Sequence, residues 1–116
     1  MSYDVISNVA DFMSACGQST IIANEPQADL YVKLITEELE ELQLAKSEVA
    51  QLDAVCDLIW VLTGFALSKG WKLQDAWDEV TRSNMDKIGP DGVTRRADGK
   101  ILKPEGWTGP QLELFV

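Results

Sequence analysis

Apolar residues recur at intervals of three and four along most of the first 88 residues, a spacing typical of amphipathic helices. The pattern predicts four helices, over about residues 4–16, 26–45, 48–69 and 73–88. Residue types that favour helix ends stand at the expected places, with Ser2 and Ser47 suited to N-caps and Gly17 to a C-terminal stop. We therefore expect an all-α fold, a bundle of four to five helices.

The predicted helix over residues 48–69 differs from the others because it is apolar nearly all round. A helix of that kind is buried on most sides, at the centre of a bundle or at a subunit interface. A chain of 116 residues has little mass with which to surround it. Self-association, as a dimer or a tetramer, is therefore expected.

The helical pattern ends at Gly89-Pro90-Asp91-Gly92. Residues 93–103 predict a small hairpin around an Asp98-Gly99 turn, and residues 104–116 predict an arm without a regular period. We interpret residues 1–116 as a single domain, with a helical core at about 4–88 and the hairpin and arm at 89–116. Residues 1–88 carry the whole formal charge of −9, whereas the hairpin is rich in basic residues.

Composition and charge exclude several classes of protein. The charge of −9 argues against a nucleic-acid partner, because phosphate backbones attract Lys and Arg. The chain has no His, which removes the commonest general base and imidazole zinc sites. The N-terminus lacks the features of a signal peptide, and the longest uncharged apolar run, residues 58–68, is too short to span a bilayer. We expect a cytoplasmic protein with no membrane partner.

The two cysteines, Cys16 and Cys56, lie in apolar helical contexts and lack CxxC spacing. This placement favours reduced, buried thiols over a disulfide.

Carboxylates on the second predicted helix fall where a soluble helix normally places apolar residues. At about 100° per residue, Glu38 and Glu41 lie within the apolar stripe, together with Tyr31. Glu37 lies at the edge of the stripe, and Glu40 faces solvent. The inward members of this set need a compensating charge.

Asp53 and Asp57 repeat the anomaly on the third predicted helix, where they share one face with Trp60. A solvated face is the ordinary explanation for a charge run, but an inward carboxylate is costly unless it is paired or binds a cation. Lys33 lies on the far side of its helix from Glu38. A hard divalent cation, Mg²⁺ or Mn²⁺, satisfies such a set of oxygens better. The expected metal ligands are Glu37, Glu38, Glu41, Asp53 and Asp57.

These motifs resemble the all-α nucleoside triphosphate pyrophosphohydrolases of the MazG-like superfamily. Glu37-Glu38-Leu39-Glu40-Glu41 matches their E-E-x-x-E motif, and Asn84-Met85-Asp86-Lys87 is similar to their Asn-x-x-Lys. The usual second motif, E-x-x-D, is absent because Ala50 and Ala54 stand three residues before Asp53 and Asp57. The spacing of those two aspartates and the segment 98–104 resemble the phage and phosphoribosyl-ATP pyrophosphohydrolase-like branch.

The resemblance implies hydrolysis of a (d)NTP to its monophosphate and pyrophosphate, with two or more Mg²⁺ or Mn²⁺ ions per site. Without His, the base is a metal-bound hydroxide or a carboxylate, for which Glu38 and Glu41 are the candidates. A phage branch of the family is guanine-directed, so dGTP or GTP ranks first among purine substrates. A phage-encoded enzyme of this kind acts in the host cytoplasm.

The residues expected to contact substrate are Asn84, Lys87, Arg95, Arg96, Lys100 and Trp60. Each has a structural alternative, because an Asn caps helix ends, hairpin cations are often solvated, and a Trp at helical spacing is more often core. Two other functions also stay open. One is phosphoribosyl-ATP pyrophosphohydrolysis, which needs a site for a second ribose phosphate, and the other is a non-catalytic helical dimerisation module with acidic faces.

Overall fold

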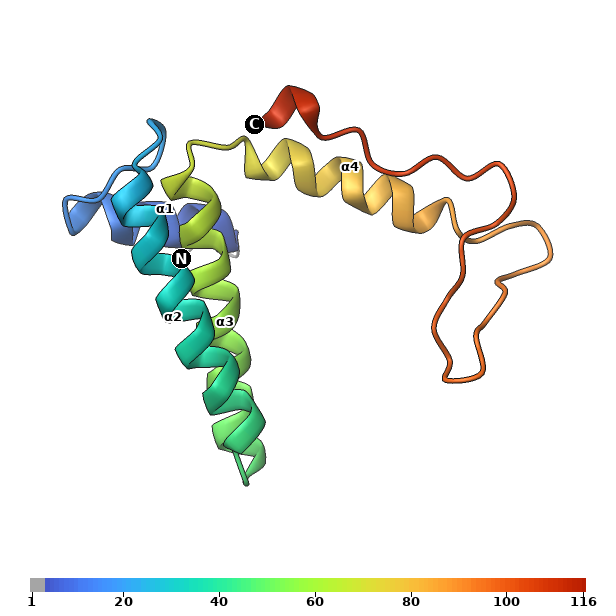
Figure 1. Cartoon of the computed structure of the whole chain (residues 1–116), viewed down its shortest axis with the longest axis horizontal. Coiled ribbons are helices and arrows are strands. Elements are labelled where there is room, and N and C mark those ends of the chain that lie inside the picture. The colour runs from blue at the N-terminus through green and yellow to red at the C-terminus, as the bar shows by residue number, and fades with distance from the viewer. Residues whose placement is uncertain (1–3) are drawn as a thin grey trace. The chain divides into compact units, whose positions relative to one another are not determined.

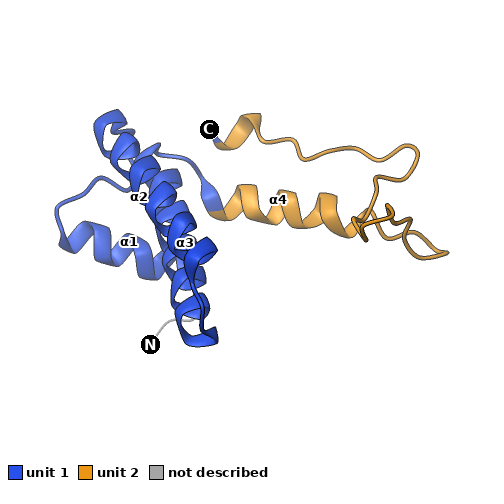
Figure 2. Ribbon diagram, turned by 60° about the horizontal axis from the view of Figure 1, so that its bottom comes forward, with its two compact units in different colours: residues 1–73, 116 blue, residues 74–115 orange. Residues whose placement is uncertain are grey.

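The computed structural model describes residues 4–116 and confirms the all-α fold (Figure 1). Its helices are α1 (Val5–Ala15), α2 (Glu25–Leu44), α3 (Glu48–Ser68) and α4 (Leu73–Met85), followed by a short 3₁₀ helix, η1 (Glu113–Phe115). Residues 4–116 contain no β-strand, only the isolated bridges Gly89–Gly92 and Arg95–Ile101. The contacts of the chain separate it into two compact units, which divide between Leu73 and Gln74 (Figure 2).

Side-chain caps fix where the first three helices begin. Asn24 accepts a hydrogen bond from the Gln27 backbone N–H, and Ser47 accepts one from that of Ala50. The prediction of Ser2 as the first cap is wrong, although Ser2 itself lies outside the described residues. Asp4 occupies that position and accepts from the Ile6 N–H at 3.0 Å. A carboxylate there also complements the positive end of the helix dipole.

Helices α2 and α3 form a hairpin, joined by residues 45–47, and lie side by side (Figure 1). Their close approach depends on Gly64, because a Cβ at that position would fall 2.6 Å from Cζ of Tyr31. Tyr31 is 3% exposed, and its hydroxyl donates to Gln18 Oε1. Helix α1 packs against α3. The core of this unit consists of Val9, Met13, Tyr31, Val61 and Leu67.

Helix α3 is not buried all round within this chain. Its exposed apolar side chains include Leu52, Val55, Ile59 and Leu62, at spacings of three, four and three. By length and composition α3 is long and apolar enough to cross a membrane, a test that the core helix of a soluble protein also passes.

The expectation of buried thiols is wrong for this chain, because Cys16 and Cys56 are both free and exposed. Cys16 is the C-cap of α1, and Cys56 lies on the exposed side of α3. Gly17, with φ of 77°, follows Cys16 and ends α1 as predicted.

The second unit, residues 74–115, contains α4, the hairpin and the arm (Figure 2). Helix α4 ends at Met85, three residues before the predicted end. The N–H groups of Lys87 and Ile88 bond back three residues rather than four, to the carbonyls of Asn84 and Met85. The hairpin is confirmed by hydrogen bonds from the Arg96 N–H to the Lys100 carbonyl and from the Leu102 N–H to the Thr94 carbonyl. The arm returns along α4, where the Trp107 Nε1–H donates to the Ser83 carbonyl at 2.6 Å.

Candidate metal centre

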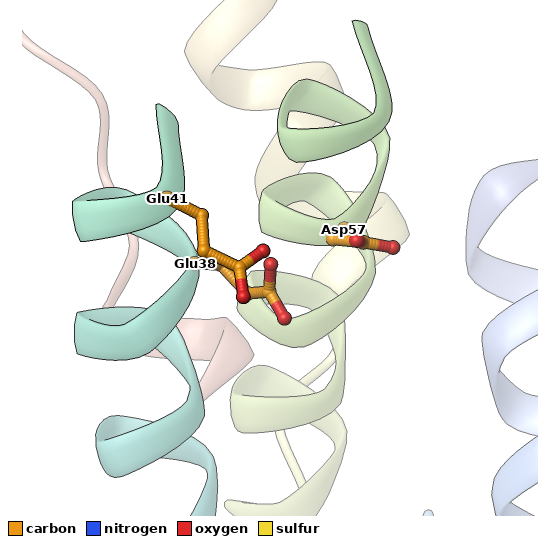
Figure 3. Close-up of side chains that lie close together, drawn as sticks. All are labelled: Glu38, Glu41 and Asp57. Carbon is orange, nitrogen blue, oxygen red and sulfur yellow. The ribbon is translucent and has the colours of Figure 1, made fainter. Parts of the chain in front are cut away.

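Three carboxylates from two helices meet between α2 and α3. Glu38, Glu41 and Asp57 each offer an oxygen, and these oxygens all lie within 4.8 Å of one another (Figure 3). Glu38 and Glu41 come from successive turns of α2 because they are three residues apart, and Asp57 comes from α3. Glu38 and Asp57 are half-buried, whereas Glu41 is exposed.

Glu38 is the most constrained member of this trio. Its Oε2 is buried and has no hydrogen-bond partner. Burial raises the pKa of Glu38 to about 7, and a hydrogen bond with Glu41 and the negative charges of Glu41, Asp57 and Asp53 act in the same direction. A buried oxygen without a donor, surrounded by like charges, is an arrangement that a bound cation relieves.

The other two predicted ligands lie on a neighbouring groove rather than in the trio. Glu37 and Asp53 line an open groove of about 540 Å³, at the end of α2 and α3 where the two helices are connected. Glu41 lines it too and so belongs to both sets. Asp53 is nevertheless close enough to raise the pKa of Glu38 electrostatically. Glu40, predicted to face solvent, is exposed and also borders this groove.

The oxygens of this centre suit a hard divalent cation. Carboxylates are the ligands that Mg²⁺ and Mn²⁺ prefer, and the described residues contain no competing imidazole because the chain has no His. Residues 4–116 place no lysine or arginine in an ion pair with Glu38, Glu41 or Asp57. The trio therefore fits a cation by donor type and by its lack of a protein counter-charge.

The predicted substrate residues fall in both units. Trp60 is half-buried and packs edge-on against Phe12 at a ring-centroid distance of 5.5 Å, next to the core of the first unit. The remaining five belong to the second unit, where Arg96 forms an ion pair with Asp98 at 2.6 Å. The Asn84 carbonyl accepts from the Lys87 N–H at the end of α4. These residues are Asn84, Lys87, Arg95, Arg96 and Lys100. Their contact with substrate stays a prediction.

Sequence reasoning did not single out Trp107 or its relation to two lysines. Lys87 Nζ lies 5.3 Å from the centre of the Trp107 ring, and Lys103 Nζ lies 5.2 Å from it. Lys87 lies just beyond the end of α4, Lys103 ends the hairpin and Trp107 lies in the arm, so no spacing rule connects the three. The only signal in the sequence is a Trp within a polar loop that also carries a Lys.

The fold and the acidic centre together define an all-α protein whose helical hairpin presents carboxylates suited to a divalent cation. The sequence model of the phosphoribosyl-ATP pyrophosphohydrolase family matches residues 14–84, which include α2, α3 and all five predicted ligands. The chain belongs to this family of pyrophosphohydrolases, within the all-α MazG-like superfamily. No curated protein shows a significant match to the chain.

Proposed function

We propose that the protein is a metal-dependent nucleoside triphosphate pyrophosphohydrolase. The observation that carries the proposal is the buried Glu38 Oε2, which has no hydrogen-bond partner and stands beside Glu41 and Asp57 in a chain of pyrophosphohydrolase lineage. The products are a (d)NMP and pyrophosphate. Purine nucleotides, with dGTP or GTP first, are the proposed substrates because the motifs resemble a guanine-directed branch.

Glu38, Glu41 and Asp57 would hold the ion, and Glu37 and Asp53 would extend the ligand set from the groove. A triphosphate carries about four negative charges, so these carboxylates repel it in the absence of metal. Bound Mg²⁺ or Mn²⁺ supplies charge neutralisation and polarises the phosphate oxygens.

The residues of the chain contribute proton transfer and orientation. Water adds to the α-phosphorus, the bond from that phosphorus to the oxygen bridging the β-phosphate breaks, and pyrophosphate departs. A carboxylate accepts the proton that the water loses. Glu38 is the first candidate for this role because its buried Oε2 has no hydrogen-bond partner and lies beside Glu41 and Asp57. Glu41, which shares a hydrogen bond with Glu38, is the second candidate.

We propose that substrate contacts come from Asn84, Lys87, Arg95, Arg96 and Lys100, with Trp60 as a stacking surface for the base. The four cations among them offer donors to a polyphosphate. Arg96 would have to exchange its Asp98 partner for substrate, whereas Lys87 and Arg95 have no ion pair within the described chain.

Self-association of the chain is the second part of the proposal. Leu52, Val55, Ile59 and Leu62 repeat at the spacing of a helix–helix seam and are 39–65% exposed, which is unfavourable on a free surface. A second copy of the chain is the proposed occupant. Light scattering should show a dimer or tetramer. Ile59→Glu should lower the molecular mass of the assembly in solution. A wild-type monomer at micromolar concentration would contradict this part.

The metal requirement is tested by thermal unfolding with and without Mn²⁺. At an ion concentration a hundredfold above Kd, binding should stabilise the fold by about 2.7 kcal/mol. Glu38→Gln should lose most of this stabilisation, whereas Glu48→Gln, at an exposed position at the start of α3, should keep it. An unfolding temperature that does not respond to Mn²⁺ favours the non-catalytic helical module.

Substrate class is tested by pyrophosphate release from a panel of NTPs, dNTPs and phosphoribosyl-ATP. Phosphoribosyl-ATP is the second candidate because the matching family carries its name. Preferential release from phosphoribosyl-ATP would replace the proposed substrate while leaving the carboxylate centre intact. Release from one purine triphosphate, at far higher kcat/KM than from the others, is the expected result.

A further inference from the structure

The arm of the second unit changes character at Gln111. The N–H of this residue donates to Glu79 Oε2 at 2.6 Å, which holds the arm on α4. Residues 112–115 then form the turn η1 (red in Figure 1), which the Phe115 N–H closes on the Leu112 carbonyl at 3.0 Å. No hydrogen bond joins residues 112–115 to any residue from 4 to 111. An anchored arm therefore presents a turn that hydrogen bonds do not hold in place.

The side chains of this turn are mostly apolar and are incompletely covered. Leu114 is 82% exposed, and Leu112 and Phe115 are half-buried. Side chains three residues apart in a 3₁₀ turn lie on the same side, so Leu112 and Phe115 share a side that excludes Leu114. The turn thus offers a free Leu beside a Phe that is accessible in part.

The residue types of this segment have the order of a recognition peptide. Short peptides bind protein grooves through a few side chains at fixed spacing, usually an apolar or aromatic anchor and a polar group that sets direction. Leu114 and Phe115 provide adjacent apolar anchors. The Gln111 amide, which carries donors and an acceptor, has only a 3.4 Å bond from Nε2 to the Gly109 carbonyl among the described residues. Glu113 is exposed between these groups.

We infer that residues 111–115 form a docking peptide for a partner protein, with Leu114 and Phe115 in an apolar pocket and the Gln111 amide in a polar one. The formal charge of the chain, −9, favours a groove with a neutral or basic rim. The partner with this groove chemistry is the ring-shaped sliding clamp of bacterial DNA polymerases, which takes peptides of the form Gln-Leu-x-Leu-Phe, the form that residues 111–115 have.

Docking of this kind goes beyond the proposed function and does not use the carboxylate centre. It would place a pyrophosphohydrolase beside the reaction that consumes dNTPs, the class of substrate proposed for it. Only this consequence rests on the proposed function. The contact itself depends on the exposed segment alone.

The test is binding of the full chain to a purified bacterial sliding clamp, measured by surface plasmon resonance. Leu114→Ala and Phe115→Ala should each weaken binding about tenfold or more, the loss expected for an anchor in an apolar pocket. Gln111→Ala should weaken it too, because the change removes the amide and keeps the backbone bond to Glu79. The free pentapeptide Gln-Leu-Glu-Leu-Phe in excess should displace the full chain.

Two variants are matched controls for these changes. Ile21→Ala removes an apolar side chain that is 83% exposed, as open as Leu114, but lies in the first unit. Glu113→Gln changes the one position of the segment that the spacing leaves unspecified. Both should bind the clamp as wild type does. Leu114→Ala should keep the wild-type unfolding temperature because its side chain is exposed.

Three results overturn the inference. They are a wild-type chain that does not bind the clamp, binding that Leu114→Ala and Phe115→Ala leave unchanged, and binding that the free pentapeptide does not displace. Pyrophosphate release should be the same in wild type and Leu114→Ala, since the segment has no part in the proposed chemistry. Absence of turnover in wild type contradicts the proposed function instead, and leaves the binding result standing.

Discussion

Carboxylates in the two units of this protein have opposite surroundings. Glu38 in the first unit has a buried oxygen without a hydrogen-bond partner, and burial raises its pKa to about 7. Glu79 in the second unit bonds to Arg82 and to the Gln111 N–H, and these contacts lower its pKa to about 2. Asp98 has the same kind of partner in Arg96. Protein groups satisfy Glu79 and Asp98 in the second unit, whereas Glu38 in the first unit keeps an oxygen without a partner.

The difference reflects where the basic residues of the chain lie and which carboxylates they pair with. The first unit contains four basic residues, of which Lys69 forms an ion pair with Glu25 at 2.7 Å. Glu25 begins α2 and Glu41 lies near its other end, so this pair does not serve the carboxylate centre. A cluster that the protein does not neutralise requires protonation or an external cation, and the proposed function rests on the second alternative.

The largest effect should come from Glu38→Gln. The change removes a proposed ligand and base, and we expect kcat/KM to fall roughly 10²–10⁴-fold, the usual contribution of a general base. The unfolding temperature without metal should stay the same or rise, because one of several like charges disappears. Steady-state pyrophosphate release and circular dichroism measure the two quantities.

Glu40→Gln is the matched control for this substitution. It makes the same change two residues away on α2, at an exposed position to which we assign no ligand role. Its kcat/KM should remain near that of wild type. If Glu38→Gln unfolds the protein, or if the two variants lose equal activity, Glu38 is a structural residue and the contrast between the units no longer holds.

A somewhat smaller effect is expected from Gly64→Ala, which tests how the fold brings the carboxylates together. A Cβ at residue 64 would meet the Tyr31 ring, with Cζ at 2.6 Å. Overpacking of this kind costs about 1–3 kcal/mol, and it should push α2 away from α3. Urea unfolding measures the loss, and Mn²⁺ affinity should fall with it. Gly109→Ala, where the nearest atom to a Cβ is 3.5 Å away, is the control in the second unit.

The pH dependence of stability should have opposite signs for the two carboxylates. Between the usual Glu pKa of 4.5 and about 7, folded Glu38 keeps a proton that the unfolded chain has lost. Stability without metal should therefore fall as the pH rises through this window. Glu79, with a pKa of about 2, favours the folded state above 4.5, and this contribution is lost as the pH falls towards 2.

Urea midpoints measured in EDTA across the pH range separate the two effects. Glu38→Gln should abolish the decline in folding stability between pH 4.5 and 7. It should leave unchanged the loss of stability at lower pH, which we attribute to Glu79. A decline that persists in Glu38→Gln would assign it to another group.

The helices were predictable because their period and their end residues are local. Ser47 caps α3 as expected, and α2 begins one residue before Pro26. The carboxylate trio followed from the same periodicity, since Glu38 and Glu41 share a face of α2 and Asp57 lies on α3. Whether Asp53 or Asp57 joins Glu38 and Glu41 depends on the register between α2 and α3. A helical wheel describes one helix at a time, so it cannot give that register.

Other features depend on contacts distant in sequence or on the whole assembly. Trp107 meets Lys87 across 20 positions of irregular chain, where no period links them. Cys56 was expected inside because α3 is apolar all round, but a single chain leaves that side of α3 open. Sequence periodicity indicates which face is apolar, and the amount of surrounding protein decides whether it is buried.

The smallest effect is expected from Glu79→Gln, which tests the carboxylate that protein groups satisfy. Arg82 would lose one of its two carboxylate partners and keep Asp86 at 2.7 Å. The pair is at the surface, where solvent and salt screen it, so we expect a slight decrease in unfolding temperature that shrinks further in high salt. Mn²⁺ stabilisation and kcat should stay at wild-type values. A large loss of turnover in Glu79→Gln would show that a carboxylate with a full set of protein partners also serves catalysis. An oxygen without a hydrogen-bond partner would then no longer distinguish the functional carboxylates of this fold from the structural ones.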